Sequence, residues 1–266
     1  LALNIGEGDE VICTNLSFIA PANMIKLSGA KPVFVDVCMD SFAMNPDKII
    51  SKITKRTRAI MIIHPFGLPA DIIKIKKIAK KYNLKIIEDV AESIGAKVKR
   101  KKLGSFGDLS CYSFFANKII TTGEGGMVVT NNGKLFKKLC LLRDHGMTVE
   151  KKYYHQCLAF NYRMTSLQAA LGIGQLSRIN TILSEKNKIK QIYDKYLNKN
   201  GYKIFPEIKK YKGVNWFVTL TFNKVGIRDK FIKYMKKNKI ECRPMIFPIT
   251  FAKHFRSYDN RKDFTN

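Results

Sequence analysis

One lysine of this chain has surroundings unlike those of the many others. Lys118 follows a short aromatic stretch at residues 112–115 and precedes small and polar residues at 121–126. A lysine enclosed in this way can lose its proton and attack an aldehyde as a neutral amine. The alternative is an ordinary solvated lysine in a turn, and Lys118 by itself does not decide between the two.

Side chains that pyridoxal phosphate chemistry requires occur upstream of Lys118. That cofactor needs a carboxylate against its pyridine nitrogen, donors for its phosphate and a flat side chain against its ring. Asp89, at the end of a predicted strand, is the candidate carboxylate, and Glu92 can face the same pocket. Ser113 is a candidate phosphate donor, and Phe18 is a candidate for stacking on the ring.

Each of these candidates also has an ordinary structural interpretation. Asp89 can cap a helix, Glu92 can be a surface glutamate, and Ser113 can be a strand-end serine without a ligand. Most phenylalanines lie in cores, so Phe18 can be a core residue. The order and spacing of the set, rather than any single member, favour a cofactor site.

Apolar runs alternate with amphipathic stretches over the first part of the chain. Helices are predicted at residues 20–28, 45–53 and 72–81. Strands are predicted at residues 10–13, 33–37, 59–63, 84–87, 111–115 and 126–130. This alternation is typical of a parallel α/β sheet, which binds its ligands at the carboxyl ends of its strands.

The second part of the chain is predicted to hold longer helices and a smaller domain. The charge pattern changes after residue 184, so we expect a large domain at 1–184 and a small α+β domain at 185–266. A helix at 165–183 is predicted to end the large domain. The small domain is predicted to hold helices at 185–196 and 228–238 and strands at 216–222 and 241–246.

The chain is strongly basic. It has 266 residues, 48 Lys and Arg against 21 Asp and Glu, and a formal net charge of +27. The lysines of residues 72–81 alternate with isoleucines at helical spacing, which indicates a solvated helix face and argues against nucleic-acid binding as the main function. A positive field still favours an anionic substrate such as a nucleotide sugar.

The cysteines and histidines give no metal or disulfide pattern. The six cysteines and four histidines have no metal-ligand spacing, so we expect no metal site and reduced cysteines in a cytoplasmic protein. No apolar run is long enough to cross a bilayer, and no membrane partner is expected.

Several motifs occur in the order of one known family. The matching stretches are residues 8–12, 29–36, 88–96, 113–118, 121–126, 143–146, 160–165, 168–170 and 240–244. The chain resembles the DegT/DnrJ/EryC1/StrS family of pyridoxal-phosphate-dependent sugar-nucleotide aminotransferases, and most closely its perosamine-synthase-like branch. The resemblance implies a fold type I transferase, similar to aspartate aminotransferase, that forms a homodimer with shared active sites.

The resemblance also implies roles for the cofactor-site candidates. Lys118 would form the Schiff base with pyridoxal 5′-phosphate, and Asp89 would face the pyridine nitrogen. Glu92 would lie beside the ring hydroxyl, as in the perosamine branch, while Ser113 would contact the phosphate and Phe18 would stack on the ring.

Four further residues receive weaker roles from the same resemblance. Asn161 would reach the phosphate of the cofactor in the partner subunit. His155, Arg163 and Arg243 are candidates for substrate contacts. Their alternatives are, in turn, a loop histidine, a structural arginine and a charge at the end of a strand.

The implied reaction is transfer of an amino group from L-glutamate to a 4-keto-6-deoxy nucleotide sugar. The alternatives are a sugar dehydratase of the same fold, in which a histidine replaces the lysine, a catalytically silent copy and a basic nucleic-acid-binding protein. The family's glycine- and threonine-containing phosphate loop lies upstream of residue 8, and its C-terminal domain continues beyond residue 266. We therefore expect the chain to be truncated at both ends.

Overall fold

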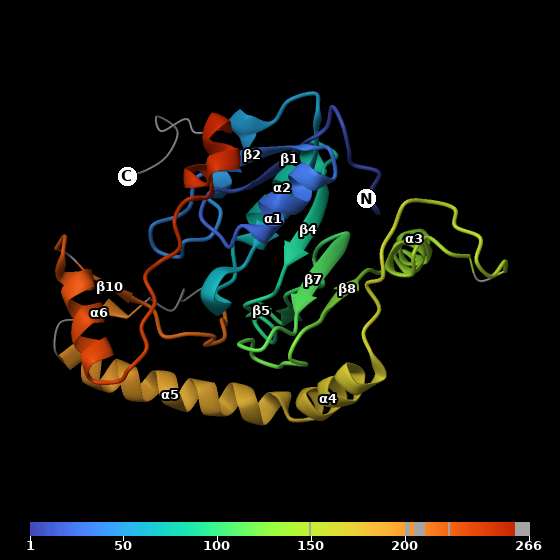
Figure 1. The fold of residues 1–266 in the computed structure, drawn as a ribbon. Coiled ribbons are helices and arrows are strands. Elements are labelled where there is room, and N and C mark those ends of the chain that lie inside the picture. Colours follow the sequence, from blue (N-terminus) through green and yellow to red (C-terminus); the bar gives the residue numbers. More distant parts are fainter. Residues whose placement is uncertain (149, 200–202, 205–210, 223, 259–266) are drawn as a thin grey trace.

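A six-stranded sheet forms the centre of the molecule (Figure 1). The computed structural model describes residues 1–148, 150–199, 203–204, 211–222 and 224–258. In spatial order the strands are β2 (Lys31–Val35), β1 (Glu10–Thr14), β3 (Thr57–Ile63), β4 (Lys85–Asp89), β7 (Leu109–Ser113) and β8 (Gly126–Val129). All neighbours are parallel except β7 and β8. The predicted α/β class with a mostly parallel sheet is confirmed.

The two faces of the sheet are covered by different helices. Alternate residues of β1 enter two separate cores: Ile12 lies in one, and Val11 and Cys13 lie in the other. Helix α2 (Ile72–Lys81) packs into the first core and α1 (Ala20–Leu27) into the second. This arrangement follows from the period of two along a strand, which sends successive side chains to opposite faces.

Helix α2 shows why the lysine-rich stretch is helical. Asp71 accepts a hydrogen bond from Lys74 N at 3.2 Å and so caps the first turn. Ile72, Ile75 and Ile78 are buried at helical spacing, while the lysines between them face solvent. The predicted amphipathic helix is confirmed.

The remaining elements flank the sheet. They are β5 (Lys97–Val98), β6 (Lys101–Lys102), α3 (Gly133–Arg143), α4 (Ser166–Ser177), α5 (Ile179–Lys199), β9 (Lys203–Ile204), β10 (Leu220–Thr221) and α6 (Ile227–Lys237). Helices α4 and α5 lie end to end along one side of the molecule, and α6 lies near the far end of α5 (Figure 1). No helix of the described residues has the length and apolar character needed to cross a membrane.

Four predicted elements were wrong. The strand expected at 216–222 is reduced to β10 at residues 220–221. The helix expected at 45–53 is two 3-10 turns, because the buried residues Pro46 and Ile49 are three apart, which suits the tighter turn. The helix expected at 165–183 breaks at Arg178, so its last residues belong to α5. The strand expected at 241–246 has no strand partner in the described chain, where Arg243 and Glu241 pair with each other instead.

The last described segment packs against the first two strands. Phe255 is fully buried, and its ring meets that of Phe34 edge to face. Asn15 accepts a hydrogen bond from Thr250 N at 3.1 Å and donates one to its hydroxyl at 3.2 Å. The domain division expected after residue 184 falls within α5 and stays a prediction, and residues 259–266 lie outside the described chain.

A buried carboxylate ties the carboxyl end of β4 to the loop that precedes β7. Glu88 is fully buried, and its Oε1 accepts hydrogen bonds from Phe106 N at 2.7 Å, Gly107 N at 2.6 Å and Ser110 Oγ at 3.2 Å. Its Oε2 accepts from Gly104 N at 2.9 Å. A buried charge is costly unless hydrogen bonds replace its hydration, and these donors do so.

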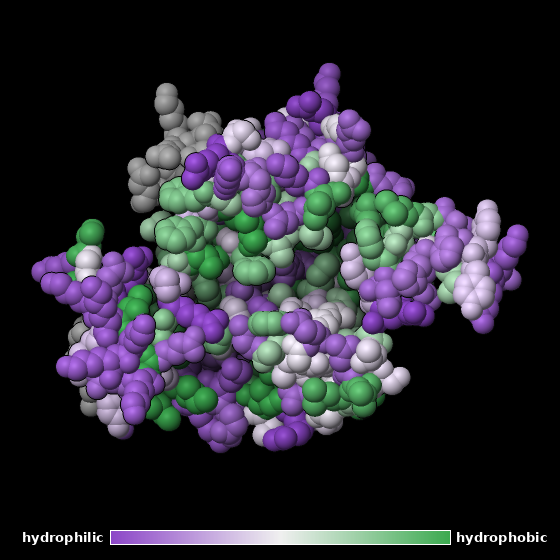
Figure 2. All heavy atoms as spheres, in the orientation of Figure 1, coloured by the Kyte–Doolittle hydropathy of each residue, from purple (hydrophilic) through white to green (hydrophobic). Residues whose placement is uncertain are grey.

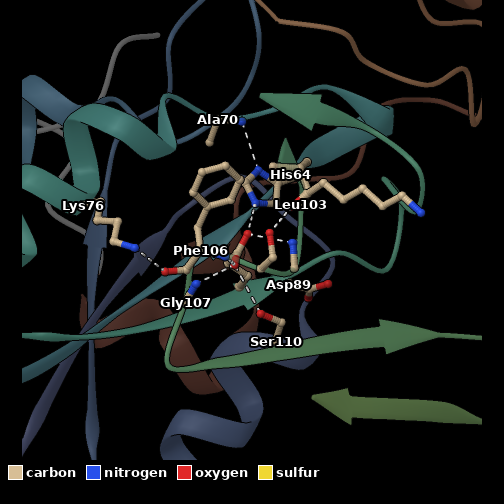
Figure 3. Close-up of polar contacts among 12 residues, drawn as sticks. His64, Ala70, Lys76, Asp89, Leu103, Phe106, Gly107 and Ser110 are labelled. Atoms are coloured by element: carbon tan, nitrogen blue, oxygen red, sulfur yellow. Dashed lines mark hydrogen bonds and ion pairs between the residues drawn. The ribbon is translucent and has the colours of Figure 1, made fainter. Parts of the chain in front are cut away.

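His64 completes this cluster from the end of β3. It is fully buried, and its Nδ1 accepts a hydrogen bond from Ala70 N at 3.0 Å (Figure 3). In the neutral ring the proton then lies on Nε2, which is 3.4 Å from Glu88 Oε2. Burial alone would raise the pKa of Glu88, but the contact with His64 and the hydrogen bonds from Gly104 and Gly107 hold that pKa below its ordinary value.

We expect Glu88→Gln to lower the free energy of unfolding by about 2–4 kcal/mol. The amide oxygen can still accept from Phe106 and Gly107, but the NH₂ group faces the N–H groups of Gly104 and His64. Urea unfolding followed by circular dichroism measures the loss. Glu185→Gln, on the exposed face of α5, is the control and should change stability by less than about 0.5 kcal/mol.

The same substitution has a pH signature. A carboxyl whose pKa is lowered in the folded state stabilises the fold above the pKa of the unfolded chain, about 4.3 for glutamate. This contribution is lost as the pH falls through the lower, folded-state pKa. The stability difference between the wild type and Glu88→Gln should therefore shrink below about pH 4. A difference that stays constant down to acid unfolding would contradict the role of the ionised carboxylate.

Candidate active site

The predicted cofactor residues follow the carboxyl ends of neighbouring strands. Phe18 follows β1, Asp89 ends β4 and Ser113 ends β7. His64, which is not one of the predicted cofactor residues, follows β3 at the same edge. Because these strands are parallel, their ends meet at one edge of the sheet, where ligands of such folds bind. Figure 2 shows the molecule hollowed near the centre of the face seen in Figure 1.

Asp89 is held rigidly at this edge. Its backbone pairs with Ile63 of β3 and Cys111 of β7, and its Oδ1 accepts a hydrogen bond from Ala91 N at 2.9 Å. Its Oδ2 has no hydrogen-bond partner among the described residues. Burial raises the pKa of Asp89, while the Ala91 hydrogen bond and the charge of Lys118 act in the opposite direction. A cationic N–H group placed at Oδ2 would satisfy this carboxylate.

Lys118 is enclosed in the turn between β7 and β8. Its N–H donates to Phe115 O at 3.0 Å, and its side chain is 13% exposed. The amine Nζ lies 3.9 Å from Glu92 Oε1 and 3.9 Å from the centre of the Trp216 ring. Burial lowers the pKa of Lys118, and the charges of Glu92 and Asp89 oppose this effect. The amine is therefore easier to deprotonate than a surface lysine.

Glu92 reaches the same place from the turn after β4. Its Oε2 accepts a hydrogen bond from Phe66 N at 2.8 Å, and its Oε1 faces Lys118. Burial raises the pKa of Glu92, opposed by the Phe66 hydrogen bond and the charge of Lys118. Lys118 thus lies beside one acid, Glu92, and feels the charge of a second acid, Asp89, from farther away.

The glycine-rich turn positions Lys118 through its backbone. Phe114 N donates to Gly125 O at 2.9 Å, and Thr121 Oγ1 donates to Phe114 O at 3.0 Å. Gly125 has φ +144°, and a Cβ there would lie 2.7 Å from Thr122 Oγ1. Glycine is required at this position because both the backbone conformation and the space exclude a side chain.

Ser113 lies at the end of a strand, whereas Phe18 lies in an exposed loop. Ser113 Oγ accepts a hydrogen bond from Phe115 N at 3.3 Å. Its own O–H group can therefore donate a hydrogen bond to a ligand. Phe18 lies in the loop before α1, and 64% of its surface is exposed. An exposed phenylalanine at the edge of a site differs from the core alternative and leaves its ring face accessible.

Three of the other four candidates, His155, Asn161 and Arg163, lie within the segment at 155–163. Asn161 Oδ1 accepts hydrogen bonds from Arg163 N and Nε, both at 3.2 Å, and Arg163 pairs with Asp144 at 3.3 Å. His155 Nδ1 lies 2.8 Å from the carbonyl oxygen of His145. All three candidates are exposed, and within the described chain their hydrogen bonds do not reach Lys118 or Asp89.

Arg243 is also outside the cluster. It pairs with Glu241 at 2.9 Å, and 67% of its side chain is exposed. An exposed pair of this kind contributes little to stability. The roles assigned to Asn161, His155, Arg163 and Arg243 stay predictions.

Two residues of the site were missed in the sequence. Trp216, from the segment after α5, covers Lys118, and Glu88 holds the strand end beside Asp89. Trp216 could have been singled out because it is the single tryptophan of the chain. Nothing distinguished Glu88, because an acid next to Asp89 also fits a solvated strand end.

The comparison with known proteins assigns the family. The DegT/DnrJ/EryC1/StrS aminotransferase family matches residues 1–266. The chain belongs to this family. GDP-perosamine synthases from Escherichia coli O157:H7 and Caulobacter vibrioides are each 41% identical to it, over 249 and 254 residues. Each alignment covers 94% of this chain and 68% of the relative.

A solved structure of an aminotransferase shares the fold. It is Helicobacter pylori PseC, an aminotransferase involved in the biosynthesis of pseudoaminic acid, with a TM-score of 0.90 and 27% identity. The match covers 97% of this chain and 71% of PseC. The predicted fold type I is confirmed, as is the prediction of an aminotransferase.

The cofactor of this aminotransferase family is pyridoxal 5′-phosphate. The residues present fit its chemistry. Asp89 offers a carboxylate oxygen that has no hydrogen-bond partner in the described parts of the chain, and Lys118 offers an enclosed amine with a lowered pKa. The pairing of a carboxylate with a nearby nucleophilic lysine is the donor set that this cofactor requires.

We expect Asp89→Asn to stabilise the cofactor-free protein by about 0.5–1 kcal/mol at neutral pH. An acid whose pKa is raised on folding destabilises the fold at any pH at which it is ionised. The asparagine can still accept the hydrogen bond from Ala91 N. The gain should vanish below the pKa of an unfolded aspartate, about 3.9. Thermal unfolding without cofactor measures it.

Asp108→Asn is the matched control. Asp108 accepts hydrogen bonds from Ile86 N at 2.9 Å and Lys85 Nζ at 3.2 Å, so each of its two oxygens has a donor. This variant should lose stability at neutral pH. If both substitutions destabilise alike, Asp89 is an ordinary structural aspartate.

Proposed function

We propose that this chain transfers an amino group to a 4-keto-6-deoxy nucleotide sugar and forms the 4-amino sugar, as a perosamine-synthase-like enzyme. The observation that carries the proposal is the enclosed Lys118 amine between Glu92 and Trp216, on the strand edge where Asp89 lies. The 41% identity to two GDP-perosamine synthases supports the substrate class. The product would serve the synthesis of surface polysaccharides or other glycans.

Lys118 would move the protons of the reaction. Bound pyridoxal phosphate supplies a carbonyl carbon for attachment and an electron sink for the reacting carbon. Once displaced by an amino donor, the Lys118 amine would remove the α-proton of that donor and return it to the C4′ carbon of the cofactor. Burial helps because it lowers the pKa of Lys118 toward neutral pH.

Asp89 and Glu92 would orient the ring and tune its charge. Asp89 Oδ2 can accept the pyridine N–H and keep the ring nitrogen protonated. Glu92 is fixed by Phe66 N, so its Oε1 can accept from the ring hydroxyl or from the amine of Lys118. Ser113 would donate to the phosphate, and Phe18 would pack on the ring face.

We further propose that the enzyme is a homodimer with shared sites. Helix α4 exposes Leu167 by 85%, Ile173 by 71% and Leu176 by 56%. Hydrophobic side chains appear along the lower edge of the molecule, over α4 and α5 (Figure 2). A second copy covering this face would remove the apolar surface from water. Asn161 would then reach the phosphate at the partner's site.

The amino donor and the compartment complete the proposal. We propose L-glutamate as donor, whose carboxylates suit the basic side chains Arg163 and Arg243. The six cysteines are all free thiols, which is expected in the cytoplasm, where nucleotide sugars are made. The sugar dehydratase alternative is not favoured, because Lys118 is present where that enzyme has a histidine.

Lys118→Met is expected to abolish the attachment of pyridoxal phosphate that borohydride fixes, and to lower amino transfer by at least about 10²–10⁴-fold. Absorbance and peptide mass spectrometry measure the attachment. Lys190→Met is the matched control, because Lys190 is 14% exposed and lies on α5. Turnover that persists in Lys118→Met would rule out the mechanism.

A panel of keto-sugar nucleotides tests the substrate class. We expect amino transfer from L-glutamate to a GDP-linked 4-keto-6-deoxy sugar, with slower transfer to UDP- and dTDP-linked analogues. Transfer to a 3-keto sugar alone would replace the proposed position of amination. Cofactor attachment at Lys118 without transfer to any of them would indicate a catalytically silent chain.

A further inference from the structure

The amine of Lys118 lies on the face of an aromatic ring. Its Nζ is 3.9 Å from the centre of the Trp216 ring, whereas the other cation–ring distances in the described residues are 4.9–5.9 Å. Tryptophan is the side chain that attracts a cation most strongly, and the attraction grows when the pair is removed from water. Trp216 is 9% exposed and the Lys118 side chain 13%, so this pair is shielded.

Trp216 is held so that its ring stays at this position. Its indole N–H donates to Asn117 O at 2.8 Å, next to Lys118 in the chain. Its ring stacks on Phe217 with the centres 4.1 Å apart, and its backbone oxygen accepts from Lys186 Nζ at 3.4 Å. The indole therefore has an anchored edge, a packed face and a second face toward the amine.

The segment that carries Trp216 is tied to the sheet. Val214 N donates to Gly67 O at 2.9 Å, and a Cβ at Gly67 would lie 1.9 Å from Val214 O. Tyr211 donates its hydroxyl proton to Asp71 at 2.7 Å. These contacts fix residues 211–216 against loops at the end of β3, and thereby bring Trp216 over Lys118.

We propose that Trp216 is a positioning residue that holds the ammonium form of Lys118 against its indole face until the amine reacts. The inference rests on the proposed function only in taking Lys118 as the reacting amine. Trp216 would act together with Glu92, which lies 3.9 Å from the same atom on another side. Asp89 adds a more distant negative charge, while burial of the amine opposes all three.

The contact has a chemical consequence. The ring favours the charged amine, and only the neutral amine attacks a carbonyl. Removing the ring face while keeping the enclosure should increase the neutral fraction of Lys118 at neutral pH. Removing the enclosure instead would hydrate the ammonium and decrease that fraction. The two effects have opposite signs, so an experiment can separate them.

Reductive methylation with formaldehyde and cyanoborohydride, followed by peptide mass spectrometry, reports the neutral fraction of each lysine across pH. In Trp216→Leu we expect Lys118 to react about tenfold faster at pH 7, with its pH midpoint moved to lower pH and its high-pH plateau unchanged. Trp216→Phe keeps a ring face but loses the indole N–H, and should stay within about threefold of the wild type. Lys190, 14% exposed, is the internal control.

Three results would overturn the proposal. One is an unchanged midpoint in Trp216→Leu, and another is a midpoint moved to higher pH. The third is an equal change in Trp216→Phe and Trp216→Leu, which would assign the effect to the Asn117 hydrogen bond or to packing. A changed rate at Lys190 would show that the variant has altered the fold. In that case the proposal is tested by the fluorescence of Trp216 in the protein that retains this tryptophan.

Trp216 is the only tryptophan of the chain, so its emission reports on Lys118 in otherwise unaltered protein. Without cofactor, we expect the emission to change with pH as Lys118 titrates, and this step to be absent in Lys118→Met. Glu92→Gln, which keeps an acceptor for Phe66 N, should move the step to lower pH. A step that persists in Lys118→Met would refute the contact. If the emission step depends on Lys118 but the protein transfers no amino group, the proposed function is refuted and the contact between Lys118 and Trp216 is not.

Discussion

The site depends on the buried carboxylate of Glu88. One residue before Asp89, it accepts hydrogen bonds from the loop at 104–107 and from Ser110, and it contacts His64. These bonds hold the ends of β3, β4 and β7 together, and they replace the hydration that a buried charge loses. Successive residues of a strand point to opposite faces, so Glu88 and Asp89 do too. The bonds that hold Glu88 therefore also fix the position of Asp89 at the end of the strand.

Lys118 combines two opposing requirements. Its amine must be enclosed to lose its proton, yet it has acids and an indole face around it that favour the charged form. Burial dominates in the balance, and its pKa is lowered. The neighbours keep the amine in one place without preventing its reaction, which is the behaviour that a lysine needs if it is to attach a cofactor and later move a proton.

Short-range patterns predicted much of the fold. Continuous apolar runs identified β1, β3 and β4, and isoleucine spacing identified α2, because both signals arise within a few residues of chain. The failures were at 45–53, where Pro46 and Ile49 pack as a 3-10 turn, and at 241–246, where no strand of the described residues lies alongside. Propensity could not reveal either, since the neighbouring segment decides which conformation is buried.

The sequence by itself determined the α/β class, the alternation that sends Asp89 and Ser113 to one edge, and Lys118 as the amine beside them. Only the tertiary structure decided that Trp216, which is 99 residues from Asn117 in the chain, covers that amine. It alone revealed that Glu88 is buried and bound, although the sequence around it also fits a solvated strand end. Both depend on long-range contacts, and local residue patterns carry no information on which distant segment will supply the partner.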